Sequence, residues 1–315
     1  MAQIAKWDLT VEQQLGSNWV ARAAYAGNKG THLSTAVDGG ANEANPALYI
    51  PGNSTPDNTQ DRRINPNFGS VGVYGSLYNS NYNALQLNVE NHVSRNFSVL
   101  ANYAWSKMID DFGPFGGINT NPFNPRQDRA ASNDDVTQVF HFSGIWQTPK
   151  FDVGRLAGGF LNSWEATSII TWRSGFPFQV YCGCDQSFSG IGLDRADFIG
   201  TSISQARVNP NRSHGQLIQQ YFNPTVFAQT TALGTFGSSG RNILRGPGFF
   251  NTDFGLVKNL HFNERLGLQF RAEFFNFFNN VNFSQPDNSL ADSTVGQIFG
   301  AGSPRTLQFA LKVSF

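Results

Sequence analysis

The sequence predicts an all-β fold, an antiparallel transmembrane β-barrel with long extracellular loops. Three observations predict this fold class. Apolar and polar residues alternate in segments that recur along the 315 residues, as in strands with one oily and one polar face. Short and long connections between these segments alternate, as in outer-membrane barrels. The last segment ends on Phe315, and the closing strand of such a barrel commonly ends on an aromatic residue.

Nine segments show the alternation, and turn or loop residues bound each of them. The predicted strands are 7–15, 19–27, 83–92, 97–106, 140–147, 165–173, 250–258, 266–274 and 307–315. Short turns are predicted at Gly16-Ser-Asn18, Ser94-Arg-Asn96, 151–162 and Asn263-Glu-Arg265. Long loops are predicted between Gly27 and Asn83, at 110–135, at 175–248 and before 307. The short turns would be periplasmic and the long loops extracellular.

The apolar residues of each segment fall on one face. In chain order they are Trp7, Leu9, Val11 and Leu15; Trp19, Ala21, Ala23 and Tyr25; Leu85, Leu87 and Val89; Phe97, Val99, Ala101, Tyr103 and Trp105; Phe140, Phe142 and Trp146; Ala166, Ile170 and Trp172; Phe250, Phe254 and Leu256; Leu266, Leu268, Phe270, Ala272 and Phe274; and Leu307, Phe309, Leu311, Val313 and Phe315. Such faces suit contact with lipid, where strands need only every second residue apolar.

Charge is almost confined to the opposite faces, as a water-filled lumen permits. These faces carry Asp8, Glu12, Arg22, Glu90, Glu165, Arg173, Arg271 and Glu273. Lys258 is the one charged residue predicted on an oily face, where it can snorkel. A Lys or Arg at the bilayer midplane of that face would cost about 2–4 kcal/mol.

Aromatic residues near the strand ends predict two lipid-interface girdles. They are Trp7, Trp19, Tyr25, Tyr103, Trp105, Trp146 and Trp172. The alternative is that they are scattered core residues of a soluble β-sandwich, whose strands also alternate. The loops of a sandwich are usually shorter than those predicted here, which favours the barrel.

The last strand is predicted to be the membrane-insertion signal that the barrel-assembly machinery recognises. Phe309, Leu311, Val313 and Phe315 would face lipid, while Gln308 and Ala310 would face the lumen.

Composition and motifs exclude several function classes. The 22 basic and 22 acidic residues balance, so a nucleic-acid partner is not predicted. The five histidines are isolated, and no motif predicts an enzyme, a metal site or a cofactor. Cys182 and Cys184 are interpreted as a loop disulfide or two free thiols rather than a metal or redox site. The pairs Asp110-Asp111 and Asp134-Asp135 are interpreted as solvated turns rather than Ca²⁺ ligands.

The topology predicts an incomplete barrel. Met1 leads into strand pattern without an export signal, so we expect residues to be missing upstream. A barrel with both termini in the periplasm has an even strand number and starts outward, whereas nine strands ending at Phe315 start inward. The last nine strands of a 22-stranded barrel fit this parity. An additional strand within 175–248 would overturn the count.

Several blocks resemble the barrel of TonB-dependent receptors of the Oar-like type. They are 80–90 (SNYNALQLNVE), 100–111 (LANYAWSKMIDD), 240–248 (GRNILRGPG), 251–259 (NTDFGLVKN) and 269–279 (QFRAEFFNFFN). The resemblance implies a 22-stranded barrel that encloses an N-terminal plug and imports a substrate actively through the bacterial outer membrane.

Residues 1–315 would then be the C-terminal part of such a barrel, without the plug. The implied partners are outer-membrane lipid, an unknown substrate, and TonB only through the missing N-terminal part. The fragment alone is expected to be inactive in transport. The alternatives are a self-contained porin or surface adhesin, and a secreted soluble β-domain.

Overall fold

An antiparallel sheet dominates the structure, a computed structural model. It describes residues 1–37, 42–44, 48–91, 96–113, 119–209, 211–229, 232–262 and 266–315. Within these residues the sheet order is β1-β2-β3-β4-β6-β7-β12-β13-β14, with β5 paired to β4. The strands are β1 (Gln3–Leu15), β2 (Trp19–Val37), β3 (Val73–Asn91), β4 (Phe97–Asp110), β5 (Ala130–Ala131), β6 (Gln138–Gln147), β7 (Trp164–Arg173), β12 (Phe249–His261), β13 (Gly267–Phe275) and β14 (Thr306–Ser314). The all-β, antiparallel prediction is confirmed.

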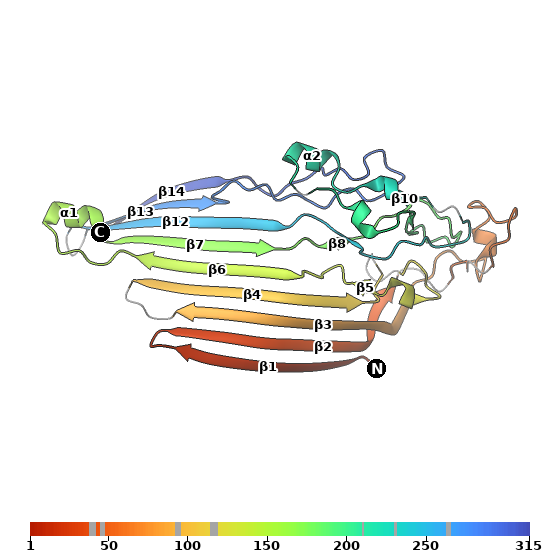
Figure 1. Ribbon diagram of the computed structural model, residues 1–315, viewed down its shortest axis with the longest axis horizontal. Helices are drawn as coiled ribbons and strands as arrows, with labels where there is room; N and C mark the ends of the chain where they lie inside the picture. Colours follow the sequence, from red (N-terminus) through yellow and green to blue (C-terminus); the bar gives the residue numbers. More distant parts are fainter. Residues whose placement is uncertain are drawn as a thin grey trace.

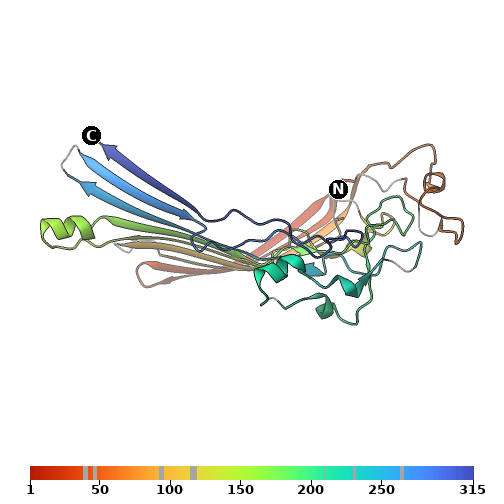
Figure 2. The same ribbon diagram turned by 90° about the horizontal axis from the view of Figure 1, so that it is seen from above.

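The two kinds of connection lie at opposite ends of the strands. The long connections gather at one end, while the short ones and α1 (Arg155–Leu161) lie at the other (Figure 1). The strands do not share one plane, because β12 to β14 diverge in direction from β1 and β2 (Figure 2). Among the described residues, β1 and β14 each pair with one strand. The sheet is therefore not closed, and the size of the complete barrel stays a prediction.

The nine predicted strands are present, but β2 and β3 extend well beyond 19–27 and 83–92. Their added halves pair from Asn28 with Tyr82 to Val37 with Val73, with register shifts around Leu33. Apolar and polar residues do not alternate regularly in these added halves. Backbone hydrogen bonds between β2 and β3, rather than an apolar pattern, therefore mark them as strands. His92 and the predicted turn residues 94, 95 and 263–265 lie outside the described residues.

The residues between Gly175 and Gly248 add no strand to the main sheet where the structure describes them. This segment contains β8 (Pro177–Phe178), β9 (Asp197–Phe198), β10 (Phe227–Ala228) and β11 (Leu244–Arg245). They pair only as β10 with β9 and β11 with β8. The described segment therefore leaves the predicted parity of nine strands unchanged.

The strand registers place the predicted oily residues on one face. Residues directly opposite in an antiparallel ladder share a face. One row across seven strands is Val11, Ala23, Leu87, Tyr103, Phe140, Trp172 and Phe250. The next row, on the other face, is Glu12, Arg22, Asn88, Asn102, His141, Thr171 and Asn251. The period-two reading of the sequence is therefore confirmed across most of the sheet.

The long connections fold against one another. We call the described residues within 42–72, 111–137, 174–248 and 276–305 the loop cap. Its helices are η2 (Gln60–Arg62), η3 (Pro125–Asp128), η4 (Ile203–Ala206), α2 (His214–Gln219) and η5 (Pro224–Val226). Its apolar core comprises Phe178, Val180, Ala196, Ala206, Phe222, Phe227 and Leu244. No helix in the described ranges is long and apolar enough to cross a membrane.

Candidate functional site

Buried ion pairs join distant parts of the loop cap to one another and to the end of β4. Arg241 Nη2 lies 2.5 Å from Asp110 Oδ1 at the end of β4, and the arginine is 2% exposed. Arg195 pairs with Asp128 in the same way, and both side chains are buried. Arg245, more exposed, pairs with the buried Asp135. Because unpaired buried charges are costly, these contacts hold the parts of the loop cap together and to the end of β4.

The interpretation of the acid pairs as solvated turns is wrong for three of the four residues. Asp110 and Asp135 hold the ion pairs just described. Asp111 is buried and accepts hydrogen bonds from the backbone N–H and side-chain amide of Asn79, at 2.6 and 3.0 Å. Asp134 is exposed, as predicted. Arg241 and Arg245 neutralise Asp110 and Asp135 from more than a hundred residues away in the chain. A local sequence pattern does not reveal such distant partners.

The two cysteines are joined in a disulfide inside the loop cap. Cys182 is fully buried and its sulfur is bonded to that of Cys184. Of the two open readings, the loop disulfide is confirmed and the free thiols are wrong. Among the described residues, no group of His, Cys, Asp and Glu is arranged to hold a metal ion.

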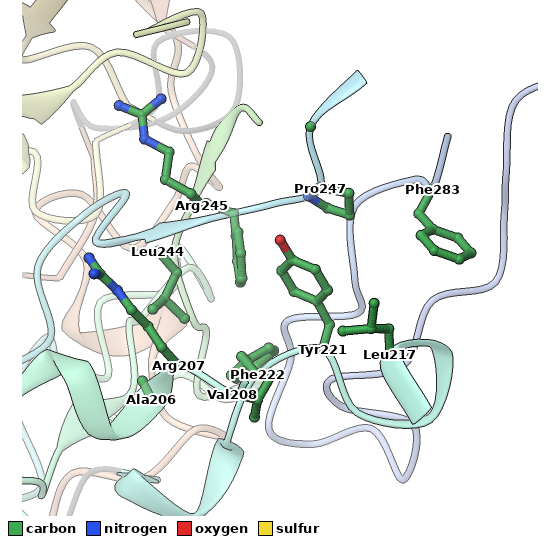
Figure 3. Close-up of a pocket in the computed structure, with 12 residues that line it drawn as sticks. Ala206, Arg207, Val208, Leu217, Tyr221, Phe222, Leu244, Arg245, Pro247 and Phe283 are labelled. Carbon is green, nitrogen blue, oxygen red and sulfur yellow. The ribbon is translucent and has the colours of Figure 1, made fainter. Parts of the chain in front are cut away.

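A cavity of about 660 Å³ lies within the loop cap (Figure 3). Residues from five parts of the chain surround it: Phe178 of β8, the end of η4 with the residues after it, α2 with Tyr221 and Phe222, the approach to β12, and Phe283. The lining residues are Phe178, Ala206, Arg207, Val208, Leu217, Tyr221, Phe222, Leu244, Arg245, Pro247, Gly248 and Phe283. A volume of this size accommodates a small organic molecule.

The cavity combines apolar walls with two polar features. Burial raises the pKa of Tyr221 to about 12, so its hydroxyl stays protonated at ordinary pH and can donate a hydrogen bond. In Figure 3 this hydroxyl points toward the Pro247 side of the cavity. The guanidinium groups of Arg207 and Arg245 lie on the side away from Phe283 (Figure 3). The Arg245 guanidinium forms an ion pair with Asp135, while Arg207 is exposed.

Local structure around the cavity depends on a close backbone approach and a helix cap. A Cβ on Gly175 would lie 1.8 Å from the carbonyl oxygen of Gly246, so position 175 needs glycine. Helix α2, which carries Leu217, starts with a capping box in which Ser213 and Gln216 bond each other's backbone N–H. This cavity was not predicted from the sequence. The apolar pair Tyr221-Phe222 within a polar loop was the available signal.

The structure places the predicted girdle aromatics at different levels of the oily face. Near the short connections, Trp146 pairs with Phe97, and the Trp19 ring lies 6.1 Å from the Phe97 ring, centre to centre. Tyr25 and Trp105 share one row through Leu85 and lie toward the loop cap. Tyr103 and Trp172 share the row of Phe140, two positions closer to the short connections. Trp7 covers Gly27, where a Cβ would lie 2.3 Å from the indole.

The terminal strand has the predicted register. Phe309 pairs with Ala272 of the oily face, and Gln308 pairs with Glu273 of the polar face. The Phe309 ring centre lies 6.4 Å from that of Phe270 and 6.3 Å from that of Phe274. Phe309, Leu311 and Val313 are each more than half exposed, and Phe315, beyond the end of β14, is fully exposed. Their role as an insertion signal stays a prediction.

One loop-cap carboxyl gives the cap a specific pH dependence. Asp194 is buried, which raises its pKa to about 7, although Ser187 donates to it from its backbone N–H at 2.6 Å and its hydroxyl at 2.9 Å. Its unfolded pKa is about 3.9. The fold therefore favours the protonated acid, and this stabilisation is complete below pH ~4 and lost as pH rises through ~7.

We expect Asp194→Asn to flatten the pH dependence of loop-cap stability between pH ~4 and ~7. The amide mimics the protonated acid, so the native cap should lose stability over this range while the variant should not. Protease resistance of the cap at a series of urea concentrations measures this. The matched control is the exposed Asp134→Asn, which should keep the native slope. A variant as pH-sensitive as the native chain would show that another group titrates.

Comparison with known proteins agrees with this architecture. The family model described as outer membrane beta barrel domain matches residues 1–308. The fold is similar to the outer membrane transporter YddB from Escherichia coli, with a TM-score of 0.50 and 9% identity over 99% of this chain and 32% of that chain. No curated protein sequence matches the chain.

Two further solved structures align with lower scores. BauA, the ferric preacinetobactin receptor from Acinetobacter baumannii, has a TM-score of 0.46 and 10% identity over 99% of this chain and 29% of that chain. FpvA from P. aeruginosa, solved with heterologous pyoverdines, has a TM-score of 0.37 and 11% identity over 98% of this chain and 30% of that chain. This chain thus spans about a third of the length of the structures it matches.

The family match covers nearly the whole chain, and the sheet has the one-sided oily surface that lipid contact requires. The chain is located in the bacterial outer membrane. The chain belongs to the family of outer membrane β-barrel domains.

Proposed function

We propose that this chain is the C-terminal barrel region of a TonB-dependent outer-membrane transporter that imports a small organic substrate. The observation that carries the proposal is the open antiparallel sheet, oily on one face and polar on the other, with long connections folded into a cap around a cavity. An open sheet edge has unsatisfied backbone groups and is not stable in lipid. Further strands of the same barrel would satisfy both edges.

The polar face provides a hydrated wall for a transport path. Arg22 Nη2 lies 2.5 Å from Glu12 Oε2, and both side chains are about half exposed. On the next strand pairs, Asn88 donates to Asn102 at 2.8 Å and Gln147 donates to Glu165 at 2.9 Å. Charged and amide groups in such ladders keep water inside a barrel lumen, while the oily face excludes it.

The distance between the two sets of interface aromatic residues is consistent with the thickness of an outer membrane. Trp105 lies eight positions beyond Phe97 on β4, which corresponds to about 27 Å along the strand. A strand tilt of about 40° reduces this to ~20 Å along the membrane normal, close to the ~25 Å apolar band of known barrels. We infer that Trp19 and Trp146 mark the periplasmic interface, and Tyr25 and Trp105 the outer one.

The cavity favours a ligand with an apolar ring or chain and one hydrogen-bond acceptor. The acceptor would receive a hydrogen bond from the Tyr221 hydroxyl, and a negative charge would be drawn toward Arg207 at the rim. The apolar part would pack against Phe178, Leu217 and Phe283. No described feature favours catalysis, and we propose binding and transport rather than enzymatic turnover.

A self-contained porin or surface adhesin is the alternative that the sequence left open. Both require the chain to close its own sheet or to close it against copies of itself. The unpaired edges of β1 and β14 in the described residues make the larger barrel the simpler explanation.

Uptake in a receptor-deleted strain tests the proposal. We expect the full-length protein to restore uptake of its substrate, Leu217→Arg to abolish it by filling the cavity, and removal of TonB to abolish it in every strain. Ile218→Arg is the matched control, because Ile218 is the next residue of α2 but does not line the cavity. Residues 1–315 alone should restore nothing. TonB-independent uptake, or equal uptake by the two arginine variants, would contradict the proposal.

A further inference from the structure

The connection between β6 and β7 presents an exposed apolar cluster at the short-connection end of the sheet. Helix α1 projects there beyond the strands (Figures 1 and 2). Phe160 is 78% exposed, Leu161 48%, and Phe151 and Val153 44% each. We call these four residues the α1 cluster. An exposed apolar group of this kind marks a surface that meets a partner or a membrane.

The end of α1 is fixed by two side chains from the neighbouring strands. Lys258 Nζ donates to the carbonyl oxygen of Phe160 at 3.1 Å and also to that of Asn162. Trp164 Nε1 donates to the same Phe160 oxygen at 2.7 Å. The last carbonyls of a helix lack intrahelical partners and favour a nearby cation. Lys258 therefore acts as the C-terminal cap of α1.

The two anchoring side chains belong to the oily face. Lys258 pairs with Trp164 on β7 and with Phe270 on β13, and the row continues to Leu311. Lys258 is only 7% exposed, and its ammonium lies 5.0 Å from the Trp164 ring centre. This explains the position of Lys258 on the oily face. The lysine does not reach free solvent but binds the backbone of α1.

The geometry points to α1 as an interfacial anchor, whose cluster inserts into the periplasmic leaflet of the outer membrane. Lys258 and Trp164, which share a row of the oily face with Phe270 and Leu311, bind the end of α1 and so hold the α1 cluster next to that face. The short connections of outer-membrane barrels lie at the periplasmic interface. Exposed Lys150, which precedes the cluster, suits the phosphates of the lipid headgroups. The inference rests on the outer-membrane location and is independent of the proposed transport.

The proposal is tested by spin labelling of the full-length protein in vesicles of phosphatidylethanolamine and phosphatidylglycerol. The two cysteines of residues 1–315 form a disulfide, so Phe160→Cys adds one free thiol to this part of the chain, and any cysteine elsewhere in the full-length protein is replaced by serine. We expect the label to collide more with oxygen than with a water-soluble nickel chelate, which gives a positive depth parameter. Phe68→Cys is the control, because Phe68 is similarly exposed but lies in the loop cap. Its depth parameter should be negative.

A negative depth parameter at position 160 would overturn the proposal, and so would exclusion of both reagents, which would indicate a protein partner. Val153→Cys provides a second site in case Phe160→Cys does not fold, and it should give the same positive sign. Lys258→Met removes the cap but keeps an unbranched side chain. It should increase the rotational mobility of the label at 160, and unchanged mobility would contradict the role assigned to Lys258.

Discussion

Replacing Arg241 with alanine is expected to destabilise the loop cap by about 3–5 kcal/mol, because Asp110 would remain buried without its cation. The lost side chain also donates to the carbonyl oxygen of Asp128 at 2.7 Å. Proteolysis of the cap in isolated outer membranes should then be faster by at least about a hundredfold, if cleavage follows the population of the open cap.

Arg22→Ala is the matched control for this prediction. Arg22 also forms a close ion pair, with Glu12, but both partners are about half exposed. Exposed pairs contribute about 0–1 kcal/mol, so the control should resemble the native protein. Equal proteolysis rates for Arg241→Ala and Arg22→Ala would show that the buried pairs do not hold the cap.

Replacing Phe309 with arginine is expected to impair barrel assembly by about 2–4 kcal/mol if the residue lies near the bilayer midplane. Phe309 packs beside Phe270 and Phe274 on the oily face. Gln308→Arg is the matched control one residue away, and it should be mild because Gln308 pairs with Glu273 on the polar face. Folded yield of the full-length protein in outer-membrane fractions is the measurement. Equal yields for the two variants would contradict the assignment of the faces.

Deletion of Phe315 tests the insertion signal in the same assay. Phe315 lies beyond the end of β14 and is fully exposed, so its removal breaks no ring contact that the structure shows. A reduced yield is therefore expected from poorer recognition by the barrel-assembly machinery, not from lost packing. A native yield without Phe315 would remove this role.

The sequence predicted the strands because contact with lipid imposes a period of two on local residues. Segments such as 97–106 and 266–274 carry this pattern in full, and their registers follow it. The outer halves of β2 and β3 do not carry it, since pairing from Asn28 to Val37 relies on backbone bonds. The full lengths of β2 and β3 were therefore not predicted, because residues alternate regularly in only part of each strand.

The loop cap was not predictable by the same reasoning. Its stabilising contacts join residues far apart in the chain, such as Arg195 with Asp128 and Arg241 with Asp110. A carboxyl pair within a polar loop resembles a solvated turn until its distant arginine is known. The cavity likewise forms from five separate segments. Lys258 was identified from its place on an oily strand, but its partner, the end of α1, emerged only from the structure.

Fluorescence quenching at two adjacent positions of β4 tests the central claim most directly. A bimane label on Tyr103→Cys should be quenched by spin-labelled lipid and not by aqueous iodide, because Tyr103 lies in the oily row with Phe140. The same label on Asn102→Cys should be quenched by iodide and not by lipid, because Asn102 lies opposite His141 on the polar face. Failure of spin-labelled lipid to quench either label would contradict a lipid-facing sheet and favour a soluble β-domain.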